Sequence, residues 1–263
     1  MSIESVDPDS LLHLLTVRLI MTSKDRLVKC KDDEPIALLV DRLEKYDLLP
    51  VFDKEIKYYV SKTEVEALPE GTRSAKVRDI KKLISESNSI SEDEPISQYL
   101  LLREKPIFVT KQNEVVGIVT PADLNKTPSK MVFYILLSFF ERLLINLIKN
   151  LNSTDNEIEG IIGFPRWWDA KGRYELADRR NLELSLIECL NTSDLINIAC
   201  KRPKIRKMLN YCNESEAHES LNPLVDLRNK VMHTGYLIIQ NEEQLIKRRV
   251  EYKRIRQHIT DLT

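Results

Sequence analysis

The chain has 263 residues, of which 42% are apolar and 31% are charged, and its formal net charge is −1. This length and apolar content allow two domains with cores of their own, and the nearly neutral charge excludes a globally basic nucleic-acid-binding protein. Residues 1 to 129 hold 19 Lys and Arg against 23 Asp and Glu, whereas residues 130 to 263 hold 21 against 18. A polyanionic partner is therefore expected to bind the second part.

The cysteines and the apolar runs bear on the compartment. Cys30, Cys189, Cys200 and Cys212 form no CxxC pair and have no metal-ligand spacing, which favours reduced thiols and predicts no metal site. The start of the chain, MSIESVDPDS, is acidic and polar, unlike a signal peptide, and the longest apolar run, MVFYILLSFF, is short for a membrane span. We expect a soluble, cytoplasmic protein that does not bind membranes.

The first half contains an internal repeat. VRLI at residues 17–20 and VRDI at residues 77–80 are each followed, after twelve intervening residues, by DEPI, at residues 33–36 and 93–96. Both matches have an offset of sixty residues. Self-similarity at a fixed period predicts a duplicated structural unit.

Both copies predict the same order of elements. In each, DEPI starts a helix, which is IALLVDRLEKYD in the first copy. Two strands follow, LPVFD and IKYYVS in the first copy and KPIFVT and EVVGIVT in the second. Each copy therefore predicts a βαββα unit of an α+β fold, too small to bury its core alone.

The stretch VVGIVTPADL, residues 115–124, resembles the motif of cystathionine-beta-synthase (CBS) domains. The resemblance implies a tandem CBS pair in residues 1 to 128, with units at about 11–70 and 71–128. It also implies clefts for an adenosine-containing nucleotide, namely AMP, ADP, ATP or a cyclic dinucleotide. Thr120 would then contact a ribose or phosphate oxygen, and Asp123 would accept from the ribose hydroxyls. The alternative is that both residues cap the following helix.

The first copy departs from this motif. YYVSKTEV places Tyr58 at the glycine position, Ser61 at the Thr position and Glu64 at the Asp position. By the same resemblance, Ser61 and Glu64 would contact a nucleotide in the first cleft. Tyr58 would occupy space where that ligand approaches the backbone.

The second half, residues 129 to 263, predicts an all-helical bundle after a polar linker, NKTPSK. A long helix over residues 131–150 precedes a predicted loop, STDNEIEGIIGFPRWWDAKGR, in which Trp167 and Trp168 either stack on nucleic-acid bases or pack the loop onto its domain. We favour packing. Two further helical stretches follow, over residues 179–202 and 241–259, and the latter predicts a basic face of Lys247, Arg248, Arg249, Lys253, Arg254 and Arg256.

The segment LVDLRNKVMHTG, residues 224–235, predicts a helix whose apolar stripe is formed by Leu224, Leu227 and Val231. On a regular helix Asn229 and His233 are neighbours, whereas Arg228 and His233 point about 140° apart. A shared site then requires that the helix end beside His233, near Gly235, or that a second copy of the helix supply the missing partner.

The Arg-x4-His spacing in this helical context resembles the motif of HEPN (higher eukaryotes and prokaryotes nucleotide-binding) domains, many of which are dimeric, metal-independent ribonucleases. The resemblance implies a catalytic set of Arg228, Asn229 and His233. His233 would transfer protons, Arg228 would stabilise phosphoryl charge and Asn229 would orient the imidazole. The alternative is a structural role without catalysis, in which Arg228 and His233 are surface cations that interact favourably with a helix C-terminus.

These observations predict a homodimeric endoribonuclease whose HEPN-type site is regulated by a nucleotide bound to the CBS pair. Single-stranded RNA is the expected substrate, and the products would carry 2′,3′-cyclic phosphate and 5′-hydroxyl ends. Two other interpretations remain open. One is a non-catalytic nucleotide-sensing protein with a helical dimerisation domain, and the other is a regulator that binds a metabolic enzyme.

Overall fold

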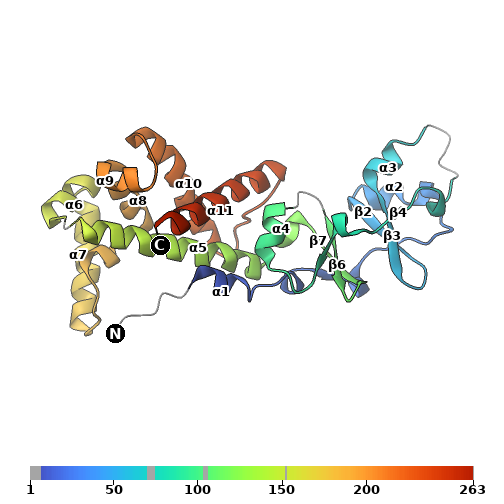
Figure 1. Cartoon of the computed structure of the whole chain (residues 1–263), viewed down its shortest axis with the longest axis horizontal. Helices are drawn as coiled ribbons and strands as arrows, with labels where there is room; N and C mark the ends of the chain where they lie inside the picture. Colours follow the sequence, from blue (N-terminus) through green and yellow to red (C-terminus); the bar gives the residue numbers. More distant parts are fainter. Residues whose placement is uncertain (1–6, 70–74, 103–105, 152, 263) are drawn as a thin grey trace. The chain divides into compact units, whose positions relative to one another are not determined.

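The structure, a computed structural model, describes residues 7–69, 75–102, 106–151 and 153–262, and the chain forms two compact units (Figure 1). Unit 1 comprises the residues up to Val132 together with Ile239–Leu245, and unit 2 comprises the remainder. The division falls inside helix α5 (Thr127–Asn150), so the predicted linker NKTPSK is instead partly the first turn of a helix. Pro128 is tolerated there because the first turn has no carbonyl partner for its missing N–H group.

Unit 1 has an α+β fold of short elements. In chain order they are α1 (Pro8–Leu12), the 3-10 helix η1 (Val17–Leu19), β1 (Thr22–Ser23), η2 (Lys24–Arg26), η3 (Ile36–Leu38), α2 (Val40–Leu43), β2 (Leu48–Phe52), β3 (Ile56–Ser61), α3 (Lys62–Glu66), η5 (Val77–Asp79), β4 (Lys82–Leu83), η6 (Glu86–Asn88), β5 (Ser89–Ser91), α4 (Ile96–Leu102), β6 (Ile107–Lys111), β7 (Glu114–Val119) and η7 (Pro121–Asn125).

The strands form two sheets, with the orders β1-β7-β6-β5 and β2-β3-β4. β1 belongs to the first copy of the repeat but pairs antiparallel with β7 of the second copy, where Thr22 lies opposite Ile118. β4 belongs to the second copy but pairs with β3 of the first, where Lys82 lies opposite Tyr59. Each copy therefore completes its sheet with a short strand from the other.

Backbone hydrogen bonds between the copies follow the sixty-residue repeat. In three pairs, a bond from the first copy to the second is matched by one in the reverse direction between residues shifted by sixty. This reciprocity is a pseudo-twofold relation between the two copies. The matched bonds are Val17 N to Glu94 O and Val77 N to Glu34 O, Arg18 N to Glu92 O and Arg78 N to Asp32 O, and Ile96 N to Leu15 O and Ile36 N to Ala75 O, at 2.8 to 3.0 Å.

The predicted order of elements is present in the second copy as β5, α4, β6, β7 and η7. In the first copy a single parallel bridge between Cys30 and Val51 stands where β5 stands in the second. The helix predicted over residues 36–47 is shorter, because it divides into η3 and α2 and ends at Leu43. The residues that follow, 44–47, are all exposed, so no buried side chain holds another turn.

The two copies share an apolar core. A cluster of Ile56, Phe108 and Ile118 combines residues of both copies, and the rings of Tyr59 and Phe108 lie 5.5 Å apart. Val77, from the second copy, is buried in the core of the first. Neither copy therefore encloses its apolar residues alone, as the sequence predicted.

Unit 2 is helical throughout its described secondary structure, as predicted. Its elements are the rest of α5, then α6 (Asp155–Ile162), α7 (Phe164–Arg179), η8 (Leu186–Cys189), α8 (Thr192–Lys201), α9 (Pro203–Met208), α10 (Glu214–Met232) and, from Ile246 onward, α11 (Glu242–Leu262). The stretch predicted as a loop is instead α6 and α7. Thr154 caps α6, and Gly163, at φ +86°, separates the two helices in a conformation that favours glycine.

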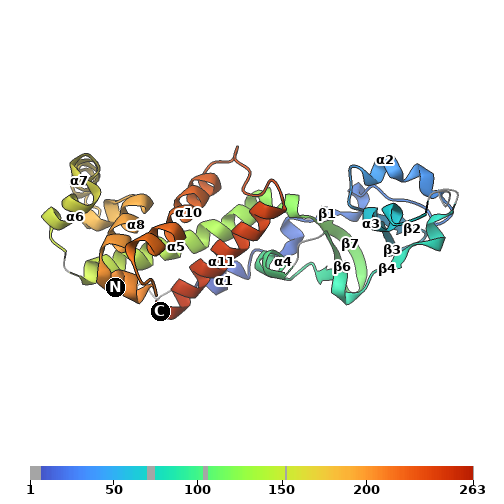
Figure 2. The ribbon, with the colours of Figure 1, turned by 90° about the horizontal axis from the view of Figure 1, so that it is seen from above.

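Helix α5 forms the centre of unit 2, beside α11 (Figure 2). The Phe133 and Tyr252 rings lie 6.4 Å apart, and Phe140 stacks on His258 at 5.7 Å. By length and composition alone α5 could also cross a membrane. Buried helices of soluble proteins satisfy the same criterion, and 44% of the most apolar window of α5 is buried.

Candidate functional site

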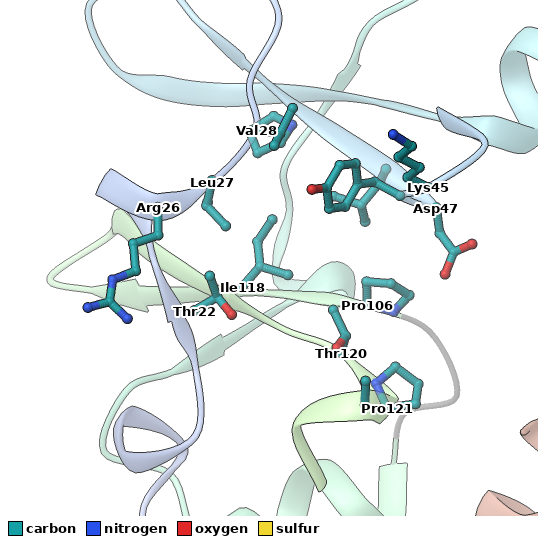
Figure 3. A pocket seen from close by; sticks show the side chains of 14 residues that line it. Thr22, Arg26, Leu27, Val28, Lys45, Asp47, Pro106, Ile118, Thr120 and Pro121 are labelled. Atoms are coloured by element: carbon teal, nitrogen blue, oxygen red, sulfur yellow. The ribbon is translucent and has the colours of Figure 1, made fainter. Parts of the chain in front are cut away.

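A cavity of about 460 Å³ lies in unit 1, and both copies of the repeat line it (Figure 3). The lining residues are Thr22, Arg26, Leu27, Val28, Lys45, Tyr46, Asp47, Leu48 and Pro50 from the first copy, and Pro106, Ile118, Thr120, Pro121 and Ala122 from the second. The exchange of β1 brings Thr22 and Thr120 to the same wall, and Val28 and Lys45 lie across from them (Figure 3).

The cavity combines an apolar lining with a few polar groups. Thr22 and Thr120 contribute hydroxyl groups, Arg26 and Lys45 contribute cations, and Asp47 contributes a carboxylate. The two cations and the carboxylate are exposed and lie at the rim. Its volume and this mixture are typical of small-molecule and cofactor sites.

Strands β1 and β7 lie so close together at position 117 that only a glycine fits there. A Cβ atom at this position would lie 2.6 Å from the Thr22 carbonyl oxygen, so any side chain would force the strands apart. The glycine of the GIVT motif therefore lets Thr22 reach the cavity wall. Tyr58, at the equivalent position of the first copy, also pairs with a short exchanged strand, opposite Leu83.

Thr120 and Asp123 were predicted to contact the nucleotide, and they form a capping box at the start of η7. Asp123 Oδ2 accepts from the Thr120 backbone N–H at 2.7 Å and from the Thr120 hydroxyl at 2.9 Å. The other oxygen, Oδ1, lies 2.7 Å from Lys126 Nζ. Thr120 lines the cavity, whereas Asp123 is only 6% exposed and is absent from the lining residues. Asp123 thus holds the turn that presents Thr120.

Ser61 and Glu64 repeat this geometry in the first copy. Glu64 Oε2 accepts from the Ser61 backbone N–H at 2.9 Å, and the Ser61 hydroxyl accepts from the Glu64 N–H at 3.4 Å. Glu64 also forms an ion pair with Lys82, and the paired hydrogen bonds lower the pKa of its carboxyl group although burial opposes them. Lys82 lies on β4, sixty residues after Thr22. Next to Ser61 and Glu64 there is therefore a lysine, Lys82, at the position where the hydroxyl group of Thr22 lies on the same wall as Thr120.

The three residues predicted as catalytic lie near the end of α10 in unit 2. Arg228 is partly exposed, and its Nε atom lies 3.7 Å from Oε1 of Glu141 on α5. Asn229 and His233 are exposed. The His233 ring lies 5.8 Å from the Tyr236 ring, at an angle of 61°.

The helix predicted for residues 224–235 ends just before His233. α10 ends at Met232, and His233 has an extended backbone at φ −108° and ψ 124°. The regular-helix geometry on which the 140° separation of Arg228 and His233 rests therefore stops at Met232. The helix end next to His233 was one of the two solutions that the sequence allowed. The predicted apolar stripe is confirmed, because Leu224, Leu227 and Val231 are buried.

The basic face predicted on α11 is only partly present, because Lys247 and Lys253 are exposed whereas Arg248 and Arg249 are buried. Arg248 is only 1% exposed, donates from Nε to the Ile238 carbonyl oxygen at 3.0 Å and from Nη1 to Glu251 at 2.6 Å. Arg249 is buried, and Arg254 donates to the Ser220 carbonyl oxygen at 2.7 Å. The guanidinium groups of Arg248 and Arg254 thus bind backbone and carboxylate oxygens within unit 2.

The other titratable groups of interest are buried. His258 Nε2 and the Tyr211 hydroxyl lie 2.9 Å apart, and burial lowers the pKa of His258 to about 4. Burial raises the pKa of the Cys30 and Cys200 thiols to about 11, so neither is a reactive thiolate at neutral pH. Across the described residues, no group of three or more His, Cys, Asp and Glu side chains is arranged to hold a metal ion.

Of the residues that line the cavity, Thr120 was predicted from the sequence, whereas Thr22, Arg26, Lys45 and Asp47 were not. They come from the other copy of the repeat, and only the exchange of β1 brings Thr22 and η2 to this wall. The relevant pattern in the sequence was the repeat of VRLI (residues 17–20) and VRDI (residues 77–80), each at the same distance before DEPI. It showed a duplication but not the exchange of strands.

Solved structures that are similar to part of this chain contain CBS domains. The CBS domain of the bacterial CNNM/CorC family Mg²⁺ transporter in complex with ATP is 21% identical, covering 44% of this chain and 89% of its own, at a TM-score of 0.36. A CBS domain-containing protein from Bacillus anthracis is 17% identical, with coverages of 44% and 94% and a TM-score of 0.38. CBSX2 of Arabidopsis thaliana is 19% identical, with coverages of 41% and 90% and a TM-score of 0.36. No protein-family model and no curated protein matches the sequence.

Proposed function

We propose that unit 1 binds an adenosine-containing nucleotide in the cavity between the two copies, and that this binding regulates unit 2. The cavity itself carries the proposal. Its volume suits a nucleotide, its hydroxyl groups on Thr22 and Thr120 suit a ribose or phosphate, and Arg26 and Lys45 supply cations at the rim. The choice of adenine rests on the resemblance of VVGIVTPADL to the CBS motif.

Calorimetry on the full chain tests the nucleotide site. We expect AMP, ADP, ATP or a cyclic dinucleotide to bind, and adenosine without phosphate to bind more weakly. Lys45→Ala should weaken nucleotide binding about five- to tenfold, because a charge-assisted hydrogen bond contributes about 1.5–3 kcal/mol when it is buried and less at an exposed rim. Lys24→Ala is the matched control, since Lys24 is exposed nearby but does not line the cavity. Failure of all four nucleotides to bind would remove the sensor role.

For unit 2 we propose metal-independent endoribonuclease activity, which the exposure of His233 beyond the end of α10 favours. The RNA 2′-hydroxyl would attack the adjacent phosphorus while its proton passes to an imidazole. The bond to the 5′-oxygen would break as that oxygen takes a proton from an imidazolium, which leaves the imidazole neutral again. Arg228 would stabilise the charge on the phosphoryl oxygens, in competition with Glu141.

Cleavage of single-stranded RNA in the presence of EDTA tests this activity. His233→Ala should lower the rate at least a hundredfold, Arg228→Ala should lower it strongly, and Asn229→Ala should lower it less. His218→Ala is the control, because His218 lies on the same helix and pairs with Glu214. The products should carry 2′,3′-cyclic phosphate ends. If His233→Ala cuts as fast as the wild type, unit 2 does not use this site, and the non-catalytic sensor becomes the better interpretation.

We also propose that the protein is a homodimer, in which each subunit supplies one His233. Met131 and Tyr134 of α5 expose large apolar side chains, which favours an interface with a second copy. Light scattering at micromolar concentration should give about twice the mass of one chain. A strict monomer that still cleaves RNA would show that one subunit is sufficient. Specific capture of a metabolic enzyme without nuclease activity would favour the third interpretation.

A further inference from the structure

Helix α7 carries an exposed pair of stacked aromatic rings. Phe164 is 57% exposed and Trp168 is 58% exposed, and their rings stack at 5.8 Å with an interplanar angle of 26°. The neighbouring Trp167 is only 8% exposed and packs inward. The two consecutive tryptophans therefore have different roles, and the packing predicted for both applies to Trp167 alone.

The side of Trp168 that faces away from Phe164 is open. Gly172 lies one helical turn after Trp168, where the side chains of residues four apart normally meet. Gly172 has no side chain, and a Cβ atom there would meet no described atom within 4 Å. Phe164 thus covers one side of the indole, and space is left on the other side for a second planar group.

A strongly basic segment contacts α6, the helix that precedes α7 in the chain. Residues 201–207, KRPKIRK, hold five cations in seven positions, and no acidic residue follows before Glu214. Lys201 Nζ donates to the Ile161 carbonyl oxygen at 3.4 Å, and Arg202 forms an ion pair with Glu157 at 3.2 Å. These contacts fix the segment against α6, whose end is joined to Phe164 by Gly163. Lys201, Lys204 and Lys207 are exposed.

We propose that Phe164 and Trp168 form a stacking platform for the bases of single-stranded RNA, with the exposed lysines of residues 201–207 binding its phosphates. Aromatic side chains beside cations bind single strands in this way, because every base offers a planar face and every nucleotide a negative charge. The basic segment favours a polyanion over an apolar protein surface. The choice of RNA rests on the nuclease activity proposed above, but the platform binds RNA independently of cleavage.

The chain has only two tryptophans, which permits a direct optical test. Trp167→Phe leaves Trp168 as the single fluorophore, and Trp168→Phe leaves the buried Trp167. Titration of each protein with a ten-nucleotide oligo(A) should quench Trp168 fluorescence and leave that of Trp167 nearly unchanged. Both variants also carry His233→Ala, so that cleavage does not alter the oligonucleotide. Equal quenching of both, or of neither, would contradict the platform.

Affinity measurements by fluorescence anisotropy complete the test. In the His233→Ala background, Trp168→Ala should weaken oligonucleotide binding about five- to a hundredfold, since stacking contributes about 1–3 kcal/mol per base. Gly172→Leu should weaken it comparably by covering the open side of the indole, while its better helix propensity keeps α7 folded. Leu182→Ala, which removes another exposed apolar side chain, should have no effect. Lys204→Glu together with Lys207→Glu should reduce the salt dependence of binding.

The outcomes separate this surface from the nuclease site. If Trp168-dependent binding is found but the wild type never cleaves RNA, the platform stands and the nuclease proposal fails. The opposite result is that the wild type cleaves RNA, while Trp168→Ala and Gly172→Leu bind the oligonucleotide as tightly as the His233→Ala protein. The platform proposal would then be wrong and the nuclease proposal would stand. Binding of anionic vesicles or of a second copy through Trp168, without binding of the oligonucleotide, would likewise overturn it.

Discussion

The side-chain amide of Asn125 holds the backbone of Ile239 with two hydrogen bonds. Asn125 Nδ2 donates to the Ile239 carbonyl oxygen at 2.7 Å, and the Ile239 N–H donates to Asn125 Oδ1 at 3.0 Å. Asn125 ends η7, which begins next to the cavity, and Ile239 begins the late segment that belongs to unit 1. One amide thus joins residues 114 positions apart in the chain.

Asn125→Ala should lower the free energy of unfolding by about 2–4 kcal/mol. Ile239 is buried, so loss of the amide leaves its N–H and C=O groups without these bonds, and each buried polar group left unpaired costs about 1–3 kcal/mol. Urea unfolding of the full chain measures the change. Asn222→Ala, at an exposed position of α10, is the control and should change stability by less than about 0.5 kcal/mol. Equal stabilities of the two variants would contradict the role of Asn125.

Gly117→Ala should destabilise unit 1 and weaken nucleotide binding together. The new Cβ atom would lie 2.6 Å from the Thr22 carbonyl oxygen, so β1 must move and Thr22 must leave its place in the cavity wall. We expect a cost of about 1–3 kcal/mol, as for overpacking in a core. Gly160→Ala in α6 is the matched control, because a Cβ atom there meets no described atom within 4 Å. That change should stabilise the chain by about 0.5–1 kcal/mol.

The fold could be predicted from the sequence where one local pattern determines each element. The repeated DEPI segments and the alternating strands of the second copy gave the βαββα order, because turn residues and hydrophobic period act within a few neighbours. The exchange of β1 and β4 could not be predicted, since two-residue strands have almost no pattern of their own. Helices α6 and α7 were missed because Gly160, Gly163, Gly172 and Pro165 are residues typical of a loop, although Pro165 lies in a first turn, where proline is tolerated.

The candidate site was predicted only in part, for a related reason. Thr120 follows directly from a motif within one stretch, whereas Arg26 and Lys45 reach the cavity through pairings between the copies. The same limit explains the error on α11. A run of Arg and Lys on a helix does not reveal which cations have partners, and the acceptors of Arg248 lie at Ile238 and Glu251.

Arg248→Met should lower the free energy of unfolding by about 3–5 kcal/mol. The guanidinium group is the partner of Glu251, which is itself buried, and removal of one member of a buried pair leaves the other charge uncompensated. Lys247→Met changes an exposed neighbour and should have little effect. The double variant Arg248→Met with Glu251→Met should recover much of the loss, because it removes both charges. Thermal and urea unfolding of the three variants test this, and a double variant no more stable than Arg248→Met would contradict the pairing.

Neutral His258 should make stability fall as the pH falls from 6.5 towards 4. Burial lowers the pKa of this imidazole to about 4 in the folded chain, whereas in the unfolded chain it is near 6.5. Between these values the unfolded chain binds a proton that the folded chain does not, so unfolding is favoured at lower pH. Neutral His258 makes its full contribution to the free energy of unfolding above about pH 6.5. This contribution amounts to about 3 kcal/mol and is lost as the pH falls to about 4.

The comparison of His258→Gln with the wild type isolates this effect. From pH 7 to pH 5 the wild type should lose about 2 kcal/mol more stability than the variant. The wild type must be compared with the variant because Glu251 also titrates. Burial raises the pKa of Glu251, so its protonation on acidification stabilises the folded chain, opposite to the effect of His258. His218→Gln serves as the control, since that imidazole is partly exposed. Parallel stability curves for the wild type and His258→Gln would show that His258 is protonated in the folded chain as readily as in the unfolded one.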